Sequence, residues 1–387
     1  MKISLSMKDR FYQIKGIYLS FFRYTKLFFL LFVGRVRLGN TQKYNKRCAV
    51  LYKVPQKPKR HSNDTEVEII HRVFNDLGYA VDLYDYKSAI LFPFFKYDCI
   101  FGFGDLFDQI CCTRKKPTMI HYLTGRPQWL SDSAECLEVK RIREFVSVDT
   151  VRYMNRSGAA SLYLADHVAY VGRGKNFDEM KTIRRDAAGV RLAAQAPEKR
   201  ILNLARDRKK VLFFGSVGAV HKGIFKYLEV ASLWSECFPN IDMEWGVIGD
   251  FNRDEIAAIE GFPRPLPEKL IIFGGLSSPG ASEFYSEAAY IINPSTSEGC
   301  CTSLIESIRC GFIPLYSSYS GIDGGLVRFL EADANIAQDY VRILEKLVQM
   351  NDREHLNLVY KSQSLCEEHS IENFRCDITS FLKSSLG

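Results

Sequence analysis

The stretch Ile291-Ile-Asn-Pro-Ser-Thr-Ser-Glu-Gly-Cys-Cys-Thr-Ser-Leu-Ile-Glu-Ser-Ile-Arg-Cys-Gly-Phe-Ile-Pro-Leu315 predicts a buried strand, a polar turn, a short helix and a second strand. The apolar run Ala289–Ile292 has the length of a strand, and Pro294 ends it. Gly311 stands where a helix C-terminal glycine belongs, and Phe312–Tyr316 begins the next strand. A strand–helix–strand unit of this kind is typical of an α/β domain with a parallel sheet.

Two glutamates in this stretch lie eight residues apart. Glu298 is in the polar turn, and Glu306 is about two helical turns into the next element. Because open α/β sheets bind ligands at the carboxyl ends of their strands, both carboxylates are expected to face one cleft there. This geometry suits a nucleotide sugar. In the alternative interpretation, Ser303 and Glu306 form a capping box and Glu298 is a solvated turn residue.

The pattern Pro-Ser-x-x-Glu-Gly, followed by Glu at the eighth position and then x4-Gly-x-x-Pro, resembles a known signature. It is similar to the Glu-x7-Glu motif of retaining glycosyltransferases of family four, which have the GT-B fold. The resemblance implies that Glu298 lies against the donor sugar and its phosphate, and that Glu306 binds the ribose hydroxyls of the nucleotide. It also assigns to the donor site Ser295, Gly299, Cys300, Cys301 and Thr302.

A second motif starts at Lys210, where a strand, a glycine loop and a helix follow one another. Its Val-His-Lys-Gly sequence, residues 220–223, resembles the Lys-Gly motif that opens the second domain in family four. The resemblance implies that Lys222 binds the donor diphosphate, assisted by backbone N–H groups of Gly215–Gly218. The family's usual arginine after the first glycine is Ser216 here. The turn that runs past the nucleotide base in such folds contains Gly275 and Leu276.

The first part of the chain alternates strands with helices, as in βαβ units. The Thr124-Gly125 loop and the helix expected at Ser133–Phe145 resemble those of capsule-type members of family four. We therefore place His121, Thr124, Gly125 and Arg173 on the acceptor side. A lone histidine beside an apolar strand is also typical of a buried structural residue. The expected strands are Arg47–Val54, Gly78–Tyr84, Tyr97–Gly104 and Thr118–Gly125, with a loop at Pro55–Asp64 and a helix at Glu66–Leu77.

At 387 residues, the chain suits two α/β domains. We expect two Rossmann-like, doubly wound domains that face a cleft, which is the GT-B arrangement, preceded by an amphipathic helix. The linker between the domains is expected within residues 177–209, which are rich in charge and poor in strand pattern. The predicted limits are 1–46 for the basic aromatic segment, 47–200 for the acceptor domain, 201–370 for the nucleotide-sugar domain, and 371–387 for a terminal helix that crosses back.

The net charge of +7 belongs to the N-terminus, because residues 1–46 carry ten Lys or Arg against one Asp and the other 341 residues sum to −2. We therefore expect no nucleic-acid partner. Aromatic side chains recur on one helical stripe over Lys8–Phe32, beside several basic residues. The apolar run Leu27–Val33 is only seven residues long, whereas a membrane span needs about 20. A helix lying on an anionic membrane surface is favoured over a signal sequence or a helix packed on its own protein.

The sequence lacks the motifs of several other classes of enzyme. The chain contains no Asp-x-Asp, so we expect metal-independent transfer and no cofactor besides the donor substrate. It has no complete dinucleotide fingerprint and no Gly-x-Ser-x-Gly, which argues against an NAD enzyme and a serine hydrolase. The eleven cysteines show no zinc-ligand spacing, which favours a reducing cytosol.

These features predict a retaining glycosyltransferase that moves a sugar from a nucleotide-diphosphate donor to a glycan or a lipid-linked glycan. The resemblance places it in the surface-polysaccharide branch of the family, and the N-terminal segment places it peripherally on the cytoplasmic face of the cell membrane. Two alternatives remain open. One is a non-catalytic nucleotide-sugar-binding homologue in a polysaccharide assembly complex, which Ser216 supports, and the other is a nucleotide-sugar epimerase of related fold.

The N-terminal segment leads to a first prediction. The full chain should sediment with anionic vesicles and be released by high salt, because each basic residue near the surface contributes about 1 kcal/mol that salt screens. Removal of residues 1–40 should abolish sedimentation without unfolding the protein. Equal binding by the full and shortened chains would refute the assignment, and resistance to high salt and alkali would indicate a membrane span.

Overall fold

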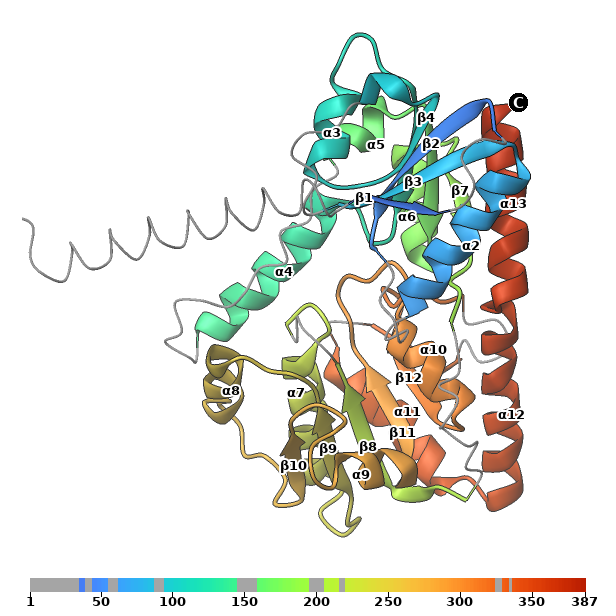
Figure 1. Ribbon diagram of the computed structural model, residues 1–387. Helices are drawn as coiled ribbons and strands as arrows, with labels where there is room; N and C mark the ends of the chain where they lie inside the picture. The colour runs from blue at the N-terminus through green and yellow to red at the C-terminus, as the bar shows by residue number, and fades with distance from the viewer. Residues whose placement is uncertain are drawn as a thin grey trace, which may run out of the picture. The chain divides into compact units, whose positions relative to one another are not determined.

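The computed structural model of the protein describes residues 35–38, 44–54, 62–86, 94–144, 159–194, 205–215, 220–323, 329–333 and 336–387. The chain forms two compact units (Figure 1). Unit 1 is Met1–His121 with Leu164–Asp166, and unit 2 is Tyr122–Tyr163 with His167–Gly387. The stripe Lys8–Phe32, predicted as a membrane-surface helix, lies outside the described residues. The domain limits predicted at residues 46, 200 and 370 stay predictions.

A mostly parallel sheet forms the core of unit 1, with strands in the order β1-β3-β2-β4-β5. The run Cys48–Tyr52 in its middle is fully buried, as expected where helices cover both faces of a parallel sheet. The elements are β1 (Arg35–Leu38), β2 (Lys46–Tyr52), α2 (Ser62–Asp76), β3 (Tyr79–Asp85), η2 (Phe94–Lys96), β4 (Cys99–Gly102), α3 (Asp105–Cys111) and β5 (Thr118–Leu123).

The two faces of this sheet carry different helices. Ile100 of β4 packs in one core cluster with Phe107 and Ile110 of α3. The ring of the next residue, Phe101, lies 5.7 Å from the ring of Phe74 on α2. Because successive residues of a strand face opposite sides, α2 and α3 cover opposite faces. This is the doubly wound arrangement that the sequence predicts.

Strand β1 corrects the sequence-based picture of the N-terminus. Arg35–Leu38 pairs antiparallel with β3 at the edge of the sheet, although the sequence placed these residues in a separate segment, 1–46. A truncation that keeps the fold should therefore stop at residue 34 rather than at residue 40. Helix α2 begins at Ser62, so the last residues of the predicted loop Pro55–Asp64 are helical.

Unit 2 contains a sheet of six parallel strands in the order β10-β9-β8-β11-β12-β13. The chain order reverses between β8 and β11. The carboxyl ends of these two strands therefore form a topological switch point, where open α/β sheets bind ligands. The strands are β8 (Asp207–Phe214), β9 (Glu244–Ile248), β10 (Leu270–Phe273), β11 (Ala288–Asn293), β12 (Ile313–Ser317) and β13 (Glu331–Ala332).

The stretch Ile291–Leu315 folds as predicted, into β11, a polar turn, α10 and β12. Gly311 adopts a φ of +98° just after α10, the conformation expected of a helix C-terminal glycine. The helices after β8 are α7 (Ile224–Cys237), α8 (Arg253–Glu260), α9 (Ala281–Glu287), α10 (Thr302–Arg309), α11 (Ala337–Gln349), α12 (Asp352–Glu368) and α13 (Ile371–Leu386).

The charge-rich segment 177–209 contains regular structure in its first part, and residues 195–204 lie outside the described ranges, so a linker within this segment stays a prediction. Most of α6 and all of the three-residue strand β7 lie within it, and β7 pairs in parallel with β6. Strand β7 is too short to show an alternating pattern, which is why the sequence does not reveal it. The elements between β5 and β8 are α4 (Gln128–Arg143), α5 (Ala159–Leu164), β6 (His167–Val171), α6 (Gly174–Ile183) and β7 (Ala188–Val190).

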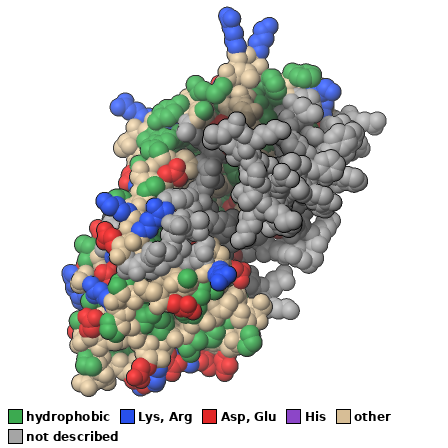
Figure 2. All heavy atoms as spheres, turned by 90° about the vertical axis from the view of Figure 1, so that its left-hand side faces the viewer, with side chains coloured by type: hydrophobic (Ala, Val, Ile, Leu, Met, Phe, Trp, Pro, Cys, Tyr) green, Lys and Arg blue, Asp and Glu red, His purple; other side chains and the backbone are tan. Residues whose placement is uncertain are grey.

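Helix α13 has the bounds that the sequence predicts. Its Asp377 accepts hydrogen bonds from Nε of Arg191 at 2.8 Å and from NH2 of Arg191 at 2.6 Å, and this attaches the helix to the residue after β7. Among the described helices, none has the length and apolar character needed to cross a membrane. In the face shown by Figure 2, acidic and basic side chains are interspersed over the lower part of the view.

Candidate functional site

The loops after β8 and β11 are joined at the switch point by hydrogen bonds to one carbonyl group. The carbonyl oxygen of His221 accepts from the Ser295 hydroxyl at 3.0 Å, from the Thr296 backbone N–H at 2.9 Å and from the Thr296 hydroxyl at 3.2 Å. All three residues are buried. The turn of the Glu-x7-Glu motif is therefore fixed against the Val-His-Lys-Gly motif.

Gly223 permits this close approach. Its φ is +82°, and a Cβ atom there would lie 2.2 Å from the carbonyl oxygen of Pro294. The glycine of the Lys-Gly motif is therefore required twice, by its left-handed backbone and by the neighbouring turn. Helix α7 starts at the next residue, so the contact also fixes where that helix begins.

Lys222 and Glu298, the two residues predicted to be catalytic, lie close together at this site. Nζ of Lys222 lies 3.8 Å from Oε1 of Glu298, and the two side chains are 13% and 12% exposed. Nε2 of the buried His221 lies 3.6 Å from the same carboxylate oxygen. Nδ1 of His221 is 4.0 Å from Oε1 of Glu135 on α4. No sequence pattern singles out His221 or Glu135, although His221 is part of the Val-His-Lys-Gly motif.

The backbone of Glu298 is fixed as well. Its N–H donates to the carbonyl of Tyr319 at 3.1 Å, and its own carbonyl accepts from the fully buried Asn176 amide at 2.6 Å. At the next residue, Gly299, a Cβ atom would lie 2.4 Å from the carbonyl oxygen of Thr124 and 2.9 Å from Cα of Gly125. The predicted acceptor-side loop Thr124-Gly125 thus lies directly against the motif.

The remaining donor-site residues after β8 and β10 are described in part. A Cβ atom at Gly215 would lie 3.4 Å from Cδ of Lys222, so Gly215 is beside the predicted diphosphate lysine. A Cβ atom at Gly275 would lie 2.6 Å from Oδ1 of Asp250, and Leu276 is half-buried. Ser216 and Gly218 lie outside the described residues.

The alternative role of Glu306 in a capping box does not hold. Helix α10 begins at Thr302 with Cys301 as its N-cap, so Ser303 is inside the helix and cannot be the capping residue of such a box. Glu306 is half-buried on this helix. Burial raises the pKa of the Cys301 thiol, which makes this cysteine a packing residue rather than a nucleophile. Cys300 is also buried.

The other predicted acceptor-side residues differ in accessibility. His121 is fully buried in unit 1, and its ring centroid lies 5.6 Å from that of Phe107, which favours the structural interpretation. Arg173 is the N-cap residue of α6, and its guanidinium lies 3.6 Å from Asp377.

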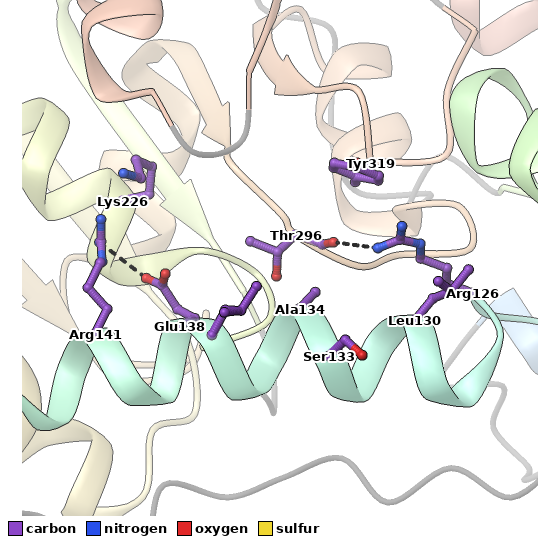
Figure 3. A pocket seen from close by; sticks show the side chains of 10 residues that line it. Arg126, Leu130, Ser133, Ala134, Glu138, Arg141, Lys226, Thr296 and Tyr319 are labelled. Atoms are coloured by element: carbon purple, nitrogen blue, oxygen red, sulfur yellow. Dashed lines mark hydrogen bonds and ion pairs between the residues drawn. The ribbon is translucent and has the colours of Figure 1, made fainter.

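A cavity of about 420 Å³ lies beside the motif in unit 2 (Figure 3). At one end the wall is formed by Arg126, which is 8% exposed. Its guanidinium donates a hydrogen bond to the carbonyl of Thr296 at 3.4 Å and lies 4.5 Å from the ring centroid of Tyr319. At the other end, NH2 of Arg141 lies 3.2 Å from Oε1 of Glu138. Its lining residues are Arg126, Leu130, Ser133, Ala134, Leu137, Glu138, Arg141, Lys226, Thr296 and Tyr319.

Within the described ranges, no three His, Cys, Asp or Glu side chains are grouped so that they could hold a metal ion.

Comparisons with known proteins identify the fold. No protein-family model and no curated protein matches the sequence. TarM is similar in structure, with a TM-score of 0.52 and 13% sequence identity. The similarity covers 75% of this chain and 55% of TarM, so the chain spans about half of that protein. WaaG, a glycosyltransferase involved in lipopolysaccharide biosynthesis, has a TM-score of 0.54 and 10% identity over 86% of this chain and 98% of its own.

A third similar structure is the E. coli trehalose-6-phosphate protein bound with UDP-2-fluoro glucose. Its TM-score is 0.58, with 9% identity over 87% of this chain and 99% of its own. These similarities show that the chain has the GT-B fold of the glycosyltransferases, as the sequence predicts.

The contact at Gly223 leads to a second prediction. Gly223→Ala should destabilise the protein by about 1–3 kcal/mol more than Gly78→Ala, because overpacking against Pro294 adds to the backbone strain. Gly78 is a matched control, since its φ is +84° but nothing lies within 4 Å of a Cβ atom there. Gly78→Ala should be destabilised by only about 1–2 kcal/mol, the cost of placing a residue with a Cβ atom in the left-handed conformation. Urea unfolding of both variants measures this, and equal losses would contradict the close approach.

Proposed function

We propose that this chain is a glycosyltransferase that moves a sugar from a nucleotide-diphosphate donor to a glycan acceptor. The observation that carries the proposal is the meeting of Lys222 and Glu298 at the switch point of the unit 2 sheet, 3.8 Å apart. In open α/β sheets this is the place where ligands bind. The GT-B fold supports the same reaction class.

Lys222 is proposed to bind the donor diphosphate. Its ammonium group is mostly buried beside Gly215, whose backbone can approach a phosphate without a side chain in the way. During transfer the leaving diphosphate gains negative charge, and a fixed cation in a site with little water stabilises that charge strongly. One TarM structure was obtained with UDP, and the E. coli protein with UDP-2-fluoro glucose, which supports a nucleotide sugar as donor.

Glu298 is proposed to act on the sugar. Its carboxylate lies next to both Lys222 and His221, and its backbone is held at both the N–H and the carbonyl. A carboxylate held in this way can orient the sugar ring and stabilise positive charge at the anomeric carbon. Glu306, on α10, is proposed to accept the ribose hydroxyls. We propose that transfer retains the anomeric configuration and requires no metal.

The acceptor is proposed to be a glycan or lipid-linked glycan of a cell-surface polysaccharide. WaaG, which has the same fold, is a glycosyltransferase of lipopolysaccharide biosynthesis, and this supports the assignment. The basic aromatic segment 1–46 supports a position on the cytoplasmic face of the membrane.

A non-catalytic nucleotide-sugar-binding homologue is the second candidate, because Ser216 replaces an arginine of family four. The two candidates differ in one measurement. A transferase slowly hydrolyses its donor to free nucleotide when no acceptor is present, whereas a binding protein only retains the donor. A panel of nucleotide sugars, screened first for thermal stabilisation and then for hydrolysis in the presence of a chelator, separates them.

As a third prediction, we expect Glu306 to contribute to nucleotide binding and Glu298 to contribute to the rate of turnover. Glu306→Ala should weaken nucleotide and nucleotide sugar alike by about 2 kcal/mol, roughly thirtyfold, because the ribose hydroxyls lose their acceptor. Glu298→Gln should keep nucleotide affinity but slow donor hydrolysis by about 100-fold, the scale of a lost transition-state contact. Calorimetric titration and hydrolysis rates measure these effects.

Glu283→Gln on α9 is the control, since this side chain is exposed. It should change neither quantity. Unchanged nucleotide affinity in Glu306→Ala would overturn the assignment of Glu306, and an unchanged hydrolysis rate in Glu298→Gln would overturn that of Glu298.

A further inference from the structure

The cavity in Figure 3 lies next to the proposed donor site, both at the turn after β11 and at helix α7. Thr296, in its wall, is two residues before Glu298 in the same turn. Lys226, also in its wall, is in the first turn of α7, the helix that begins directly after the Lys222-Gly223 pair. The volume of about 420 Å³ is within the usual range for small-molecule sites, about 300–1,000 Å³. A ligand in this cavity would therefore be next to the proposed reaction centre.

The charges around the cavity balance one another. Arg126 lies 2.7 Å from Glu179, Arg141 lies 3.0 Å from Glu229, and Lys226 lies 2.7 Å from Glu229. The remaining carboxylate is that of Glu138, which Arg141 also contacts. Of the lining residues, three are cations and one, Glu138, is a carboxylate, but each cation lies within 3.2 Å of a carboxylate oxygen of Glu138, Glu179 or Glu229, the last two of which are behind the lining. Sites that recognise phosphate instead present cationic groups in excess, because a phosphate carries up to two negative charges.

Paired charges of this kind are suited to hydroxyl groups. A hydroxyl both donates and accepts, so it can donate to a carboxylate and accept from a guanidinium or ammonium in the same wall. Lys226 is only 4% exposed and Glu138 only 8% exposed, so these charged groups are largely desolvated. Burial raises the pKa of Glu138. At Glu229 burial also acts to raise the pKa, but the hydrogen bonds and charges of Lys226 and Arg141 together lower it below its ordinary value.

The cavity also has an apolar side. Leu130, Ala134 and Leu137 follow one another on one face of α4, at the spacing of a helical stripe, and all three line the cavity. Leu137 is 71% exposed, which is unusual for a leucine in a cavity wall. The Tyr319 ring lies across from α4 in Figure 3. Apolar and aromatic walls with a few convergent polar groups are typical of sites for small ligands.

We propose that this cavity binds an uncharged sugar ring, the terminal glycosyl unit of the acceptor, in preference to a sugar phosphate. The apolar face of the ring would lie on the Leu130, Ala134 and Leu137 stripe, and its hydroxyls would meet the paired charges of Glu138, Arg141 and Lys226. The role as acceptor subsite rests on the proposed transferase function. The choice of an uncharged ring rests on the charge balance alone.

Saturation-transfer NMR with uncharged methyl glycosides tests the proposal on the full chain. The probes are the methyl glycosides of glucose, galactose and N-acetylglucosamine, with glucose 6-phosphate for comparison, each at about 10 mM because a lone sugar ring is expected to bind with a Kd on the order of 1 mM. At least one methyl glycoside should give signals with the native protein, and glucose 6-phosphate should give weaker ones. Absence of every methyl glycoside signal, or a stronger signal from the sugar phosphate, would overturn the proposal.

Variants on α4 locate the bound glycoside. Ala134→Phe fills the cavity and should reduce the glycoside signal at least tenfold, whereas Cys136→Phe, which introduces the same ring at an exposed position of α4 outside the lining, should not. Leu137→Glu, at an exposed side chain, removes part of the apolar wall without disturbing a core and should also reduce the signal. Equal signals in Ala134→Phe, Leu137→Glu and Cys136→Phe would overturn the assignment.

Nucleotide binding separates this proposal from the proposed function. Excess UDP should leave the glycoside signal in place, and displacement by UDP would put the glycoside in the donor site and refute a separate subsite. Thermal stabilisation by UDP and by the nucleotide-sugar panel should be the same in the native protein, Ala134→Phe and Cys136→Phe. If no nucleotide stabilises any of them, the transferase function fails, while the glycoside signals still decide whether the cavity binds a sugar ring.

Discussion

The carbonyl group of His221 is the acceptor on which the rest of the site depends. Its hydrogen bonds from Ser295 and Thr296 hold together two loops that are more than 70 residues apart in the chain. Each such bond contributes only about 1 kcal/mol to stability, but an unpaired buried donor would cost more than that. These hydrogen bonds therefore select one relative position of the two loops. Because a Cβ atom at position 223 would clash with Pro294, only a glycine there allows the loops to approach this closely.

This constraint explains how a lysine and a glutamate come to lie side by side in a mostly buried position. Lys222 directly follows His221, and Glu298 follows the turn that the His221 carbonyl holds. Each charge compensates for the other in a region of little water, where an isolated charge would be costly. The ion pair therefore holds the ammonium group of Lys222 and the carboxylate of Glu298 at fixed positions, as the proposed reaction requires.

The sequence predicts the parts of this structure that depend on local patterns. Helix α13 begins at Ile371 because its N-cap Ser370 accepts a hydrogen bond from the backbone N–H of Asn373, and a serine directly before a helical pattern is a signal that can be recognised in a sequence. Strands β11 and β12 are continuous apolar runs. By contrast, β1 and β7 have only four and three residues, too few for a pattern to emerge. The contacts of His221 with Glu135 and Glu298, and the cavity beneath Tyr319, join distant residues through tertiary packing and leave no trace at any fixed spacing.

The most direct test of the account is the affinity of Lys222→Ala for a nucleoside diphosphate and for its monophosphate, measured by calorimetry with a chelator present. The nucleoside is the one whose diphosphate sugar stabilises the native protein most. Lys209→Ala, at an exposed position of β8, is the control. We expect Lys222→Ala to bind the diphosphate about ten- to hundredfold more weakly, because one charge-assisted contact is lost, and we expect a smaller effect on the monophosphate. Diphosphate affinity equal to that of the native protein, or binding that requires added magnesium or manganese, would contradict it.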